Sequence, residues 1–387
     1  MRPSFGFKGN AALMVSHCAG MLDLVALPLW IGVLVASYQF DSQQSGGLVT
    51  LFLIGAVCAS MFVAPRFKKW NRRAIAVGGF LLAALCFFAA AQVQEYSVLA
   101  ILHLCAGLTS SSALSMAHGT IARSPNPHKL FAIAGFCLGV TGFFFMGATP
   151  NITKAVGGHA IFIIFGGIMA IASLICFIAF PSLTKSELSE GNNVGEKTQK
   201  IPTGVWFGIL AISLMAITQA MTFSFMERVG HDRGFEHQNI VMILVALALI
   251  NIVAAALAGI LEKRLSPRAV LIIGPILQII LANIIMNAEV LPVFAAGSMF
   301  FVAIMIFTHT FVFGLLAKLD TSGRALAATP AMLMVGAAIG PILGGTLIKL
   351  VGYQGIGVAA AVFGFVSILC FLRVFTSAQT GEVESAV

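Results

Sequence analysis

The sequence predicts an all-α integral membrane protein with 12 transmembrane helices in two pseudo-symmetric six-helix halves. Of its 387 residues, 59% are hydrophobic and 9% are charged, whereas about 25% are charged in ordinary soluble domains. Apolar runs of about 20 residues, the length that crosses a bilayer, follow nearly every polar cluster. These runs are continuous, unlike the alternating segments of a membrane β-barrel. An internal repeat, described below, predicts the two halves.

The twelve predicted spans follow one another with short loops between them. The first apolar run is longer than the apolar core of a signal peptide, which has roughly 7–15 residues. We therefore expect this run to stay uncleaved and to form the first span. A polar segment at 181–203 follows the sixth span and is typical of a flexible linker. The chain is therefore divided into an N-terminal half (1–180), a cytoplasmic linker (181–203), a C-terminal half (204–376) and a cytoplasmic tail (377–387). The spans are 11–37, 46–65, 74–93, 97–122, 130–150, 158–180, 204–226, 239–261, 269–288, 291–317, 325–350 and 354–375.

The basic residues predict the orientation, because Lys and Arg concentrate in cytoplasmic loops. With the N-terminus inside, 18 of the 22 Lys and Arg residues fall on the inner side. The other four are Lys154, Arg228, Arg233 and Lys349. Both termini are therefore expected in the cytoplasm, and we expect a multi-pass protein of a bacterial inner membrane. The net charge of +8 reflects this orientation, so no nucleic-acid partner is expected.

The two halves repeat each other with a shift of 195 positions and no gaps. Basic and glycine residues at the span ends coincide in five separate loops under this single shift. Six spans in each half mean that the halves have the same orientation and are related by an axis along the membrane normal. The matched positions include Arg73 with Arg268, Gly79 with Gly274, Lys154 with Lys349, and Gly157 with Gly352.

The loop after the second span has a basic signature. Residues 64–73 are similar to the pattern G-x-x-x-D-R-x-G-R-R between helices 2 and 3 of the major facilitator superfamily. Lys69, Arg72 and Arg73 match, but Lys68 stands at the acidic position and both glycines are absent. The equivalent loop of the second half carries Arg264 and Arg268 among its basic residues. With the repeat and the linker, the chain resembles this family over essentially its whole length.

This resemblance implies a secondary active transporter that moves a small organic solute by alternating access, in a direction that the sequence leaves open. It also implies that Lys69, Arg72, Arg73, Arg264 and Arg268 belong to cytoplasmic gating loops. The small molecule, protons as coupling ion and the lipid bilayer are the expected partners. The alternative is a non-transporting membrane protein, either receptor-like or an intramembrane enzyme.

A glycine motif in the eleventh span has two interpretations. The segment from Gly336 to Gly345 resembles the G-x-x-x-G-P-x-x-G-G motif that antiporters of this family carry in helix 5. Here the motif lies in the repeat partner of that helix. Glycines four residues apart also allow helices to approach closely, so tight packing at a helix crossing is the interpretation that we favour.

Asp23 is the one carboxylate that the sequence places deep in a span. Charged groups within a bilayer are costly and usually functional. On a continuous helix, Ser16, Asp23 and Trp30 share one face, and an acidic residue shortly before a proline, here Pro28, is similar to proton-coupled members of the family. We therefore predict that Asp23 couples transport to protons. The alternative is a structural hydrogen bond, for example to a histidine of the fourth span.

The predicted solute cavity is lined by polar and aromatic residues of spans 1, 4, 7 and 10, the spans that line it in the family. No Lys or Arg lies near the middle of any span, so an anionic solute lacks a deep counter-ion. A histidine within a span can bind solute or relay protons, or it can be a satisfied core residue. The candidates are Trp30, His103, Ser110, Gln219, Thr308 and His309.

Enzyme chemistry has no sequence support. The chain has no G-x-x-x-x-G-K-[ST] nucleotide loop, no H-E-x-x-H metal motif and no G-x-S-x-G nucleophile elbow. We therefore expect no enzymatic activity, catalytic residue, metal or cofactor. His231 and His237 with their acidic neighbours are interpreted as a solvated loop. The seven cysteines lie in apolar runs and are interpreted as small hydrophobic residues.

Overall fold

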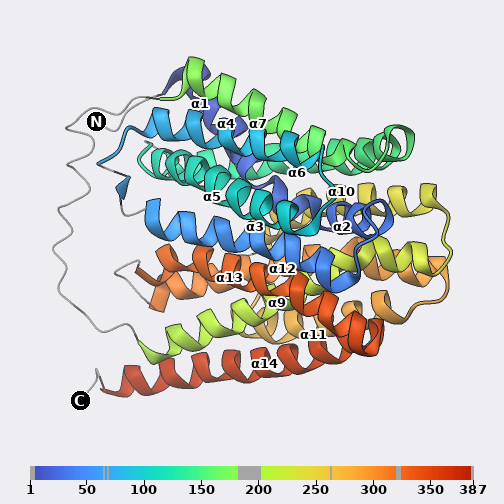
Figure 1. Cartoon of the computed structure of the whole chain (residues 1–387). Helices are drawn as coiled ribbons and strands as arrows, with labels where there is room; N and C mark the ends of the chain where they lie inside the picture. The colour runs from blue at the N-terminus through green and yellow to red at the C-terminus, as the bar shows by residue number, and fades with distance from the viewer. Residues whose placement is uncertain are drawn as a thin grey trace. The chain divides into compact units, whose positions relative to one another are not determined.

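The computed structural model of the chain describes residues 5–63, 66–67, 69–124, 126–181, 202–261, 264–319 and 324–384. Within these ranges every regular element is a helix (Figure 1). The helices are α1 (Gly6–Gly20), α2 (Leu22–Ala36), α3 (Ser42–Val63), α4 (Arg72–Ala90), α5 (Tyr96–Ile121), α6 (Pro127–Val156), α7 (Ala160–Ala179), α9 (Thr203–Asp232), α10 (His237–Leu261), α11 (Pro267–Asn287), α12 (Leu291–Leu319), α13 (Arg324–Val351) and α14 (Tyr353–Glu384).

Twelve stretches of helix within the described residues are long and apolar enough to cross a membrane, and each coincides with a predicted span. The predicted fold class is confirmed. The first span consists of two helices, α1 and α2, with Met21 between them. Two helices run about six residues beyond the predicted spans, α6 to Val156 and α9 to Asp232. The apolar run marks only the part of a helix that fits the hydrocarbon core, and hydrogen bonding continues past that part.

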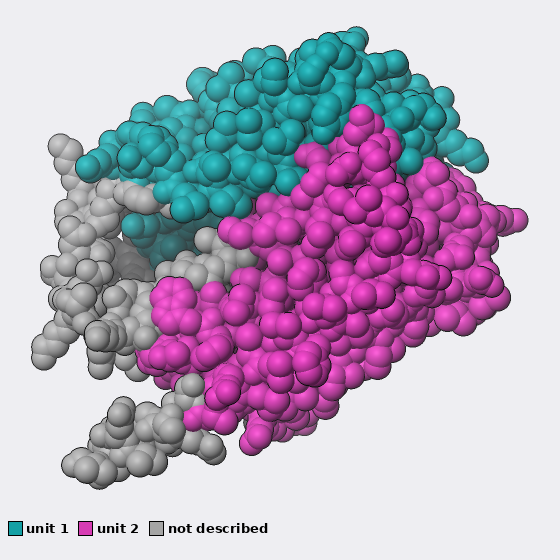
Figure 2. Space-filling model, turned by 60° about the horizontal axis from the view of Figure 1, so that its bottom comes forward, with its two compact units in different colours: residues 1–40, 48–197 teal, residues 41–47, 198–387 magenta. Residues whose placement is uncertain are grey.

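The chain divides into two compact units, shown in different colours in Figure 2. Unit 1 comprises residues 1–40 and 48–197, and unit 2 comprises residues 41–47 and 198–387. The start of α3 thus belongs to unit 2, although the rest of that helix belongs to unit 1. The predicted linker lies outside the described residues except at its ends, as does Lys68 of the loop signature.

Unit 1 is held together by close helix contacts at glycines. A Cβ placed on Gly55 of α3 would lie 2.5 Å from the carbonyl oxygen of Leu104 on α5. A Cβ on Gly79 of α4 would lie 2.5 Å from the carbonyl oxygen of Thr109 on the same α5. Small residues are needed here because lipid tails are as apolar as leucine, so helix association depends on close van der Waals packing. The α5 helix is therefore fixed against two neighbours in unit 1.

Unit 2 is built around α9, which packs against α13 and α14. Gly336, Gly340 and Gly344 of α13 face the backbone of α9, where added Cβ atoms would lie 2.6, 2.5 and 3.0 Å from α9 atoms. The predicted glycine motif therefore makes a tight helix crossing within unit 2, which is the packing interpretation of that motif. Large side chains such as Met215 and Phe371 fill the adjoining core.

Candidate functional site

Asp23 lies in the first turn of α2, directly after the interruption of the first span at Met21. The α1 helix ends with a hydrogen bond from the Met21 N–H to the His17 carbonyl, 3.0 Å long, after Gly20, a residue of low helix propensity. The interruption gives α2 its own N-terminus, whose unpaired N–H groups and helix dipole favour a negative charge. The Leu24 N–H donates a hydrogen bond to the carboxylate.

The rest of the Asp23 side chain is isolated. The side chain is 6% exposed, and Oδ1 has no hydrogen-bond partner among the described residues. The predicted alternative, a hydrogen bond to a histidine of the fourth span, is not among the contacts of this residue. Burial favours the neutral acid, whereas the helix N-terminus favours the ionised carboxylate. A carboxyl group in this balance is suited to gaining and losing a proton.

Trp30 and His103 stack on each other inside unit 1. Their ring centroids lie 5.3 Å apart at an interplanar angle of 26°, and both side chains are buried. The Leu99 carbonyl accepts a hydrogen bond from Nδ1 of His103 at 2.7 Å, while Nε2 has no partner in the described structure. Three phenylalanines surround the indole: Phe52, Phe87 and Phe165. Both predicted cavity residues thus belong to an aromatic core in this structure.

Ser110 lies on the same buried stripe of α5 as His103. Its hydroxyl donates a long hydrogen bond of 3.4 Å to the Gly107 carbonyl. Further along the same stripe, Leu114 lies against Gly20 of α1. The stripe is therefore occupied by helix packing within unit 1, and its role in solute binding stays a prediction.

Gln219 meets a glutamine in unit 2 that the prediction omitted. Nε2 of Gln278 on α11 donates hydrogen bonds to the Met215 carbonyl at 3.1 Å and to Oε1 of Gln219 at 3.4 Å. Nε2 of Gln219 and Oε1 of Gln278 have no partner in the described structure. One amide donor and one amide acceptor of this pair are thus unused within the described structure.

Thr308 and His309 both lie on α12. Thr308 is buried and packs against Gly274 of α11, a position where a Cβ would collide with the threonine hydroxyl. Nδ1 of His309 donates a hydrogen bond of 2.9 Å to the Met305 carbonyl, and the centroid of the His309 ring lies 5.1 Å from that of the Phe313 ring. The structure joins neither residue to Gln219 by a hydrogen bond.

The predicted gating loops make cation–π contacts. Arg72 and Arg123 approach the ring of Phe67 at 5.4 and 4.3 Å, and Arg268 lies 5.9 Å from the ring of Phe375. Arg73 donates a hydrogen bond to the Phe177 carbonyl. Lys69 and Arg264 are exposed. These contacts fix three of the five predicted residues, and their gating role stays a prediction.

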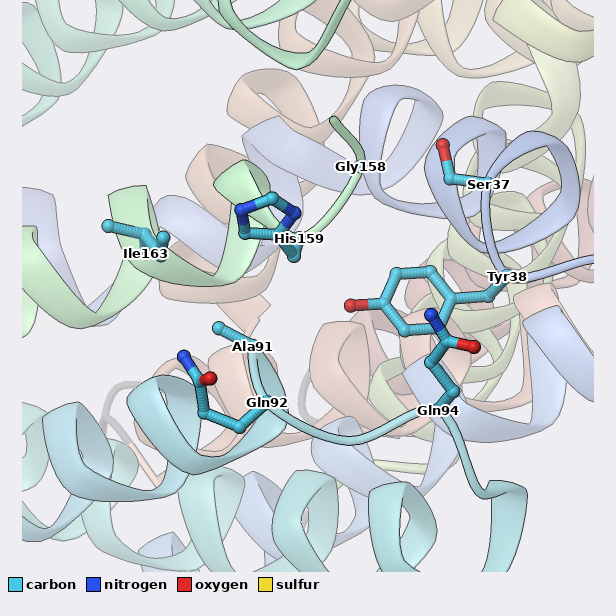
Figure 3. Close-up of a pocket in the computed structure, with 8 residues that line it drawn as sticks. All are labelled: Ser37, Tyr38, Ala91, Gln92, Gln94, Gly158, His159 and Ile163. Atoms are coloured by element: carbon cyan, nitrogen blue, oxygen red, sulfur yellow. The ribbon is translucent and has the colours of Figure 1, made fainter. Parts of the chain in front are cut away.

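A cavity of about 380 Å³ lies at the end of unit 1 where α2 and α4 end and α7 begins (Figure 3). The Tyr38 ring packs between Phe40 and Phe162, and its hydroxyl points into the cavity. Burial raises the pKa of this hydroxyl to about 12, so it stays neutral. The remaining lining includes Gln92, Gln94 and His159. None of the predicted cavity residues lines it.

Two contacts could not be read from the sequence. His17 of α1 and His118 of α5 are hydrogen-bonded to each other, and Gln278 is bonded to Gln219. The sequence signal was their polar character inside apolar runs, but that signal is shared by many residues that make no such pair. Among the described residues, no group of three or more His, Cys, Asp or Glu could hold a metal ion.

Comparisons with known proteins agree with this architecture. A comparison with curated protein sequences found no match. Among solved structures, the chain is similar to the nucleoside transporter NupG (13% identity, TM-score 0.72, 97% of this chain and 100% of that chain). It is also similar to a D-xylose-proton symporter (13% identity, TM-score 0.75, 96% of this chain and 97% of that chain). A third similar structure is that of a bacterial homologue of the human lysosomal transporter Spinster (13% identity, TM-score 0.73, 96% of this chain and 96% of that chain). At this identity the likeness shows the fold alone. The family model of the Major Facilitator Superfamily matches residues 12–319 and 208–386, and the chain belongs to this superfamily of multi-pass membrane transporters.

Proposed function

We propose that this protein is a proton-coupled secondary transporter that moves a small, uncharged, polar organic solute across the membrane by alternating access. Asp23 is the proton-coupling residue, and both termini face the cytoplasm of a bacterial cell. The observation that carries the proposal is the position of Asp23: a buried carboxylate at a helix N-terminus, with one oxygen unpaired and no cation bonded to it among the residues that the structure describes.

The transport step follows from the two influences on Asp23. When the carboxyl group meets water on one side, it exchanges a proton with that side. After the change of access, the carboxyl group meets water on the other side. While it is buried between these two states, burial favours its neutral form, so the change of access takes place without an unpaired charge in the membrane. Solute binding that depends on the protonation state then links the solute gradient to the proton gradient.

The uncharged character of the solute is inferred from the side chains available to it. The predicted spans lack a central Lys or Arg, and a buried anion without such a partner is costly. The amides of Gln219 and Gln278 leave one donor and one acceptor unused. Such groups suit hydroxyl, carbonyl or amide functions. Two structural neighbours are a nucleoside transporter and a D-xylose-proton symporter, which supports the same solute class for this chain.

The test uses purified protein in proteoliposomes with radiolabelled nucleosides and monosaccharides as probes. Asp23→Asn has the size of the neutral acid but cannot titrate. We expect accumulation driven by a pH gradient to be lost in this variant, while solute exchange at equal concentrations on both sides continues. Gln278→Leu is expected to weaken solute binding and to leave the protonation of Asp23 unaffected.

The matched control is Glu95→Gln, which neutralises the exposed carboxylate before α5 and should transport like the wild type. Unchanged proton-driven accumulation by Asp23→Asn would contradict the role of Asp23. No uptake or exchange of any probe by the folded wild-type protein would contradict the proposed solute class.

A further inference from the structure

Two histidines form a hydrogen-bonded pair inside unit 1. Nδ1 of His17 on α1 lies 2.9 Å from Nε2 of His118 on α5, and the ring centroids are 5.1 Å apart. His17 is 7% exposed, and the ring of His118 packs edge-on against Phe131 of α6 at 5.5 Å. The pair therefore lies among three helices of the unit and outside the residues assigned to the solute or to Asp23.

The backbone brings the two rings together. One turn away from the pair, Gly20 of α1 lies against Leu114 of α5, where an added Cβ would be 2.8 Å from the leucine Cβ. This close approach brings α1 near α5, so that residues one turn further along both helices meet. Ser16, one turn before Gly20 on α1, lies 3.1 Å from the Cys176 sulfur of α7. The imidazole contact is thus built into the packing of the unit.

The helices around this pair carry several basic side chains and one carboxylate. His17 and His118 are hydrogen-bonded to each other. Asp23 is the only carboxylate described on helices α1–α7, and it lies six residues after His17, at the start of α2. The other titratable side chains described on α1 and α3–α7 or directly after α5 are Lys8, Cys18, Cys58, Arg72, Arg73, Cys86, Tyr96, His103, Cys105, Arg123, Lys129, Cys137, Lys154 and Cys176.

We propose that His17 and His118 together form a second proton-binding site, which takes up one extra proton and keeps the hydrogen bond between His17 Nδ1 and His118 Nε2. The proton balance is simple. Two neutral imidazoles carry two N–H groups, one of which lies in the shared hydrogen bond. An added proton binds to a free ring nitrogen and gives an imidazolium hydrogen-bonded to a neutral imidazole. When the proton leaves, the neutral pair is restored.

The geometry of the pair accepts a first proton more readily than a second. A hydrogen bond from an imidazolium to a neutral acceptor is stronger than one between neutral groups, so the first proton strengthens the 2.9 Å contact. A second proton would place two positive rings 5.1 Å apart and leave the bond without an acceptor. The two rings should therefore titrate as one coupled unit.

The use of this proton in transport rests on the proposed function. In that function, the first span carries Asp23 after the interruption and His17, one ring of the histidine pair, before it. His118 lies three residues before the end of α5, on the membrane side where α1 begins. We infer that protonation of the pair sets the acidic part of the pH profile of transport.

The site is tested directly by ¹⁵N nuclear magnetic resonance of the full chain labelled at histidine. As the pH falls from about 8 to about 4, a range around the ordinary histidine pKa, the signals of His17 and His118 should change together with one midpoint. In His118→Gln, which retains a neutral hydrogen-bonding group, the His17 signal should lose that midpoint. His159→Gln at the exposed loop before α7 is the control and should leave the pair unchanged.

Independent midpoints for the two rings, uptake of two protons, or no change in either ring while the protein stays folded would each overturn the site. The wild-type titration decides this even where a variant fails to fold. In proteoliposomes, His118→Gln should lose the acidic part of the pH profile, and an unchanged profile would overturn the inferred use. The titration in Asp23→Asn separates the two proposals, since failure of Asp23 as the coupling residue leaves the midpoint of the pair in place.

Discussion

Nζ of Lys349 on α13 lies 2.8 Å from Oδ2 of Asp41, the residue directly before α3. The same ammonium group approaches Oε1 of Gln43 at 3.3 Å, and the Gln43 amide donates to the Thr346 hydroxyl. A Cβ on Gly345 would collide with the Ser42 carbonyl. Polar bonds and close backbone contact therefore fix the start of α3 within unit 2.

This ion pair predicts a stability that depends on pH. Burial alone would raise the pKa of the Asp41 carboxyl, but hydrogen bonds from Lys349 and the Gln44 backbone, with the Lys349 charge, hold it below its ordinary value. The stabilisation is therefore present above the ordinary pKa of about 4 and is lost as the pH falls through the lowered pKa.

We expect Lys349→Met to lower the free energy of unfolding at pH 7 by at most about 1 kcal/mol, because both partners are part-exposed. The difference from wild type should vanish once the pH is below the lowered pKa of Asp41, where the carboxylate is protonated. Thermal unfolding in detergent at pH 7 and below that pKa measures this. Lys154→Met is the control, since Lys154 is the exposed repeat counterpart of Lys349 on α6. Equal effects of the two substitutions would refute the prediction.

The stack of Trp30 on His103 predicts that ring shape matters more at position 103 than the imidazole nitrogens. His103→Ala should cost about 2–5 kcal/mol, as large-to-small core substitutions do. His103→Phe keeps a ring against Trp30 and loses the bond to the Leu99 carbonyl, at a cost of about 1 kcal/mol. Chemical denaturation compares them. A phenylalanine variant that is stable but inactive would instead assign the imidazole a role in transport.

The contact of Gly20 with Leu114 predicts that even one methyl group is harmful at this position. Gly20→Ala should destabilise the protein by about 1–3 kcal/mol through overpacking, and it should separate His17 from His118. The matched control is Gly78→Ala on α4, where an added Cβ meets nothing within 4 Å. We expect the control to be neutral. Similar unfolding midpoints for the two variants would show that α1 and α5 are less closely packed than described.

The proposed orientation predicts the sides from which loops are accessible. In a cysteine-free background, cysteines at Glu95 and Glu289 should react with a membrane-impermeant maleimide added outside intact cells. A cysteine at Ser266, before α11 on the opposite side, should react only after the membrane is made permeable. All three positions are exposed. The reverse pattern of labelling would invert the orientation.

The amino-acid sequence by itself determined the number and approximate limits of the spans. Each span is a local property: a run of apolar residues either reaches across the hydrocarbon core or does not, and its backbone must satisfy its own hydrogen bonds. The repeat at 195 positions is equally local, because it compares residues without reference to their contacts. Asp23 was found by the same reasoning, as a charge inside such a run.

Only the tertiary structure decided how polar residues within the spans are paired. His17 meets His118 across 101 positions of the chain, Gln219 meets Gln278 across 59, and Lys349 meets Asp41 across 308. These pairs depend on where helices cross, and the crossings depend on glycines such as Gly20 whose neighbours lie on other helices. The interruption at Met21 is likewise absent from the hydropathy pattern, because both α1 and α2 are apolar. A helix N-terminus at Asp23 therefore arises from backbone geometry that no local count of apolar residues contains.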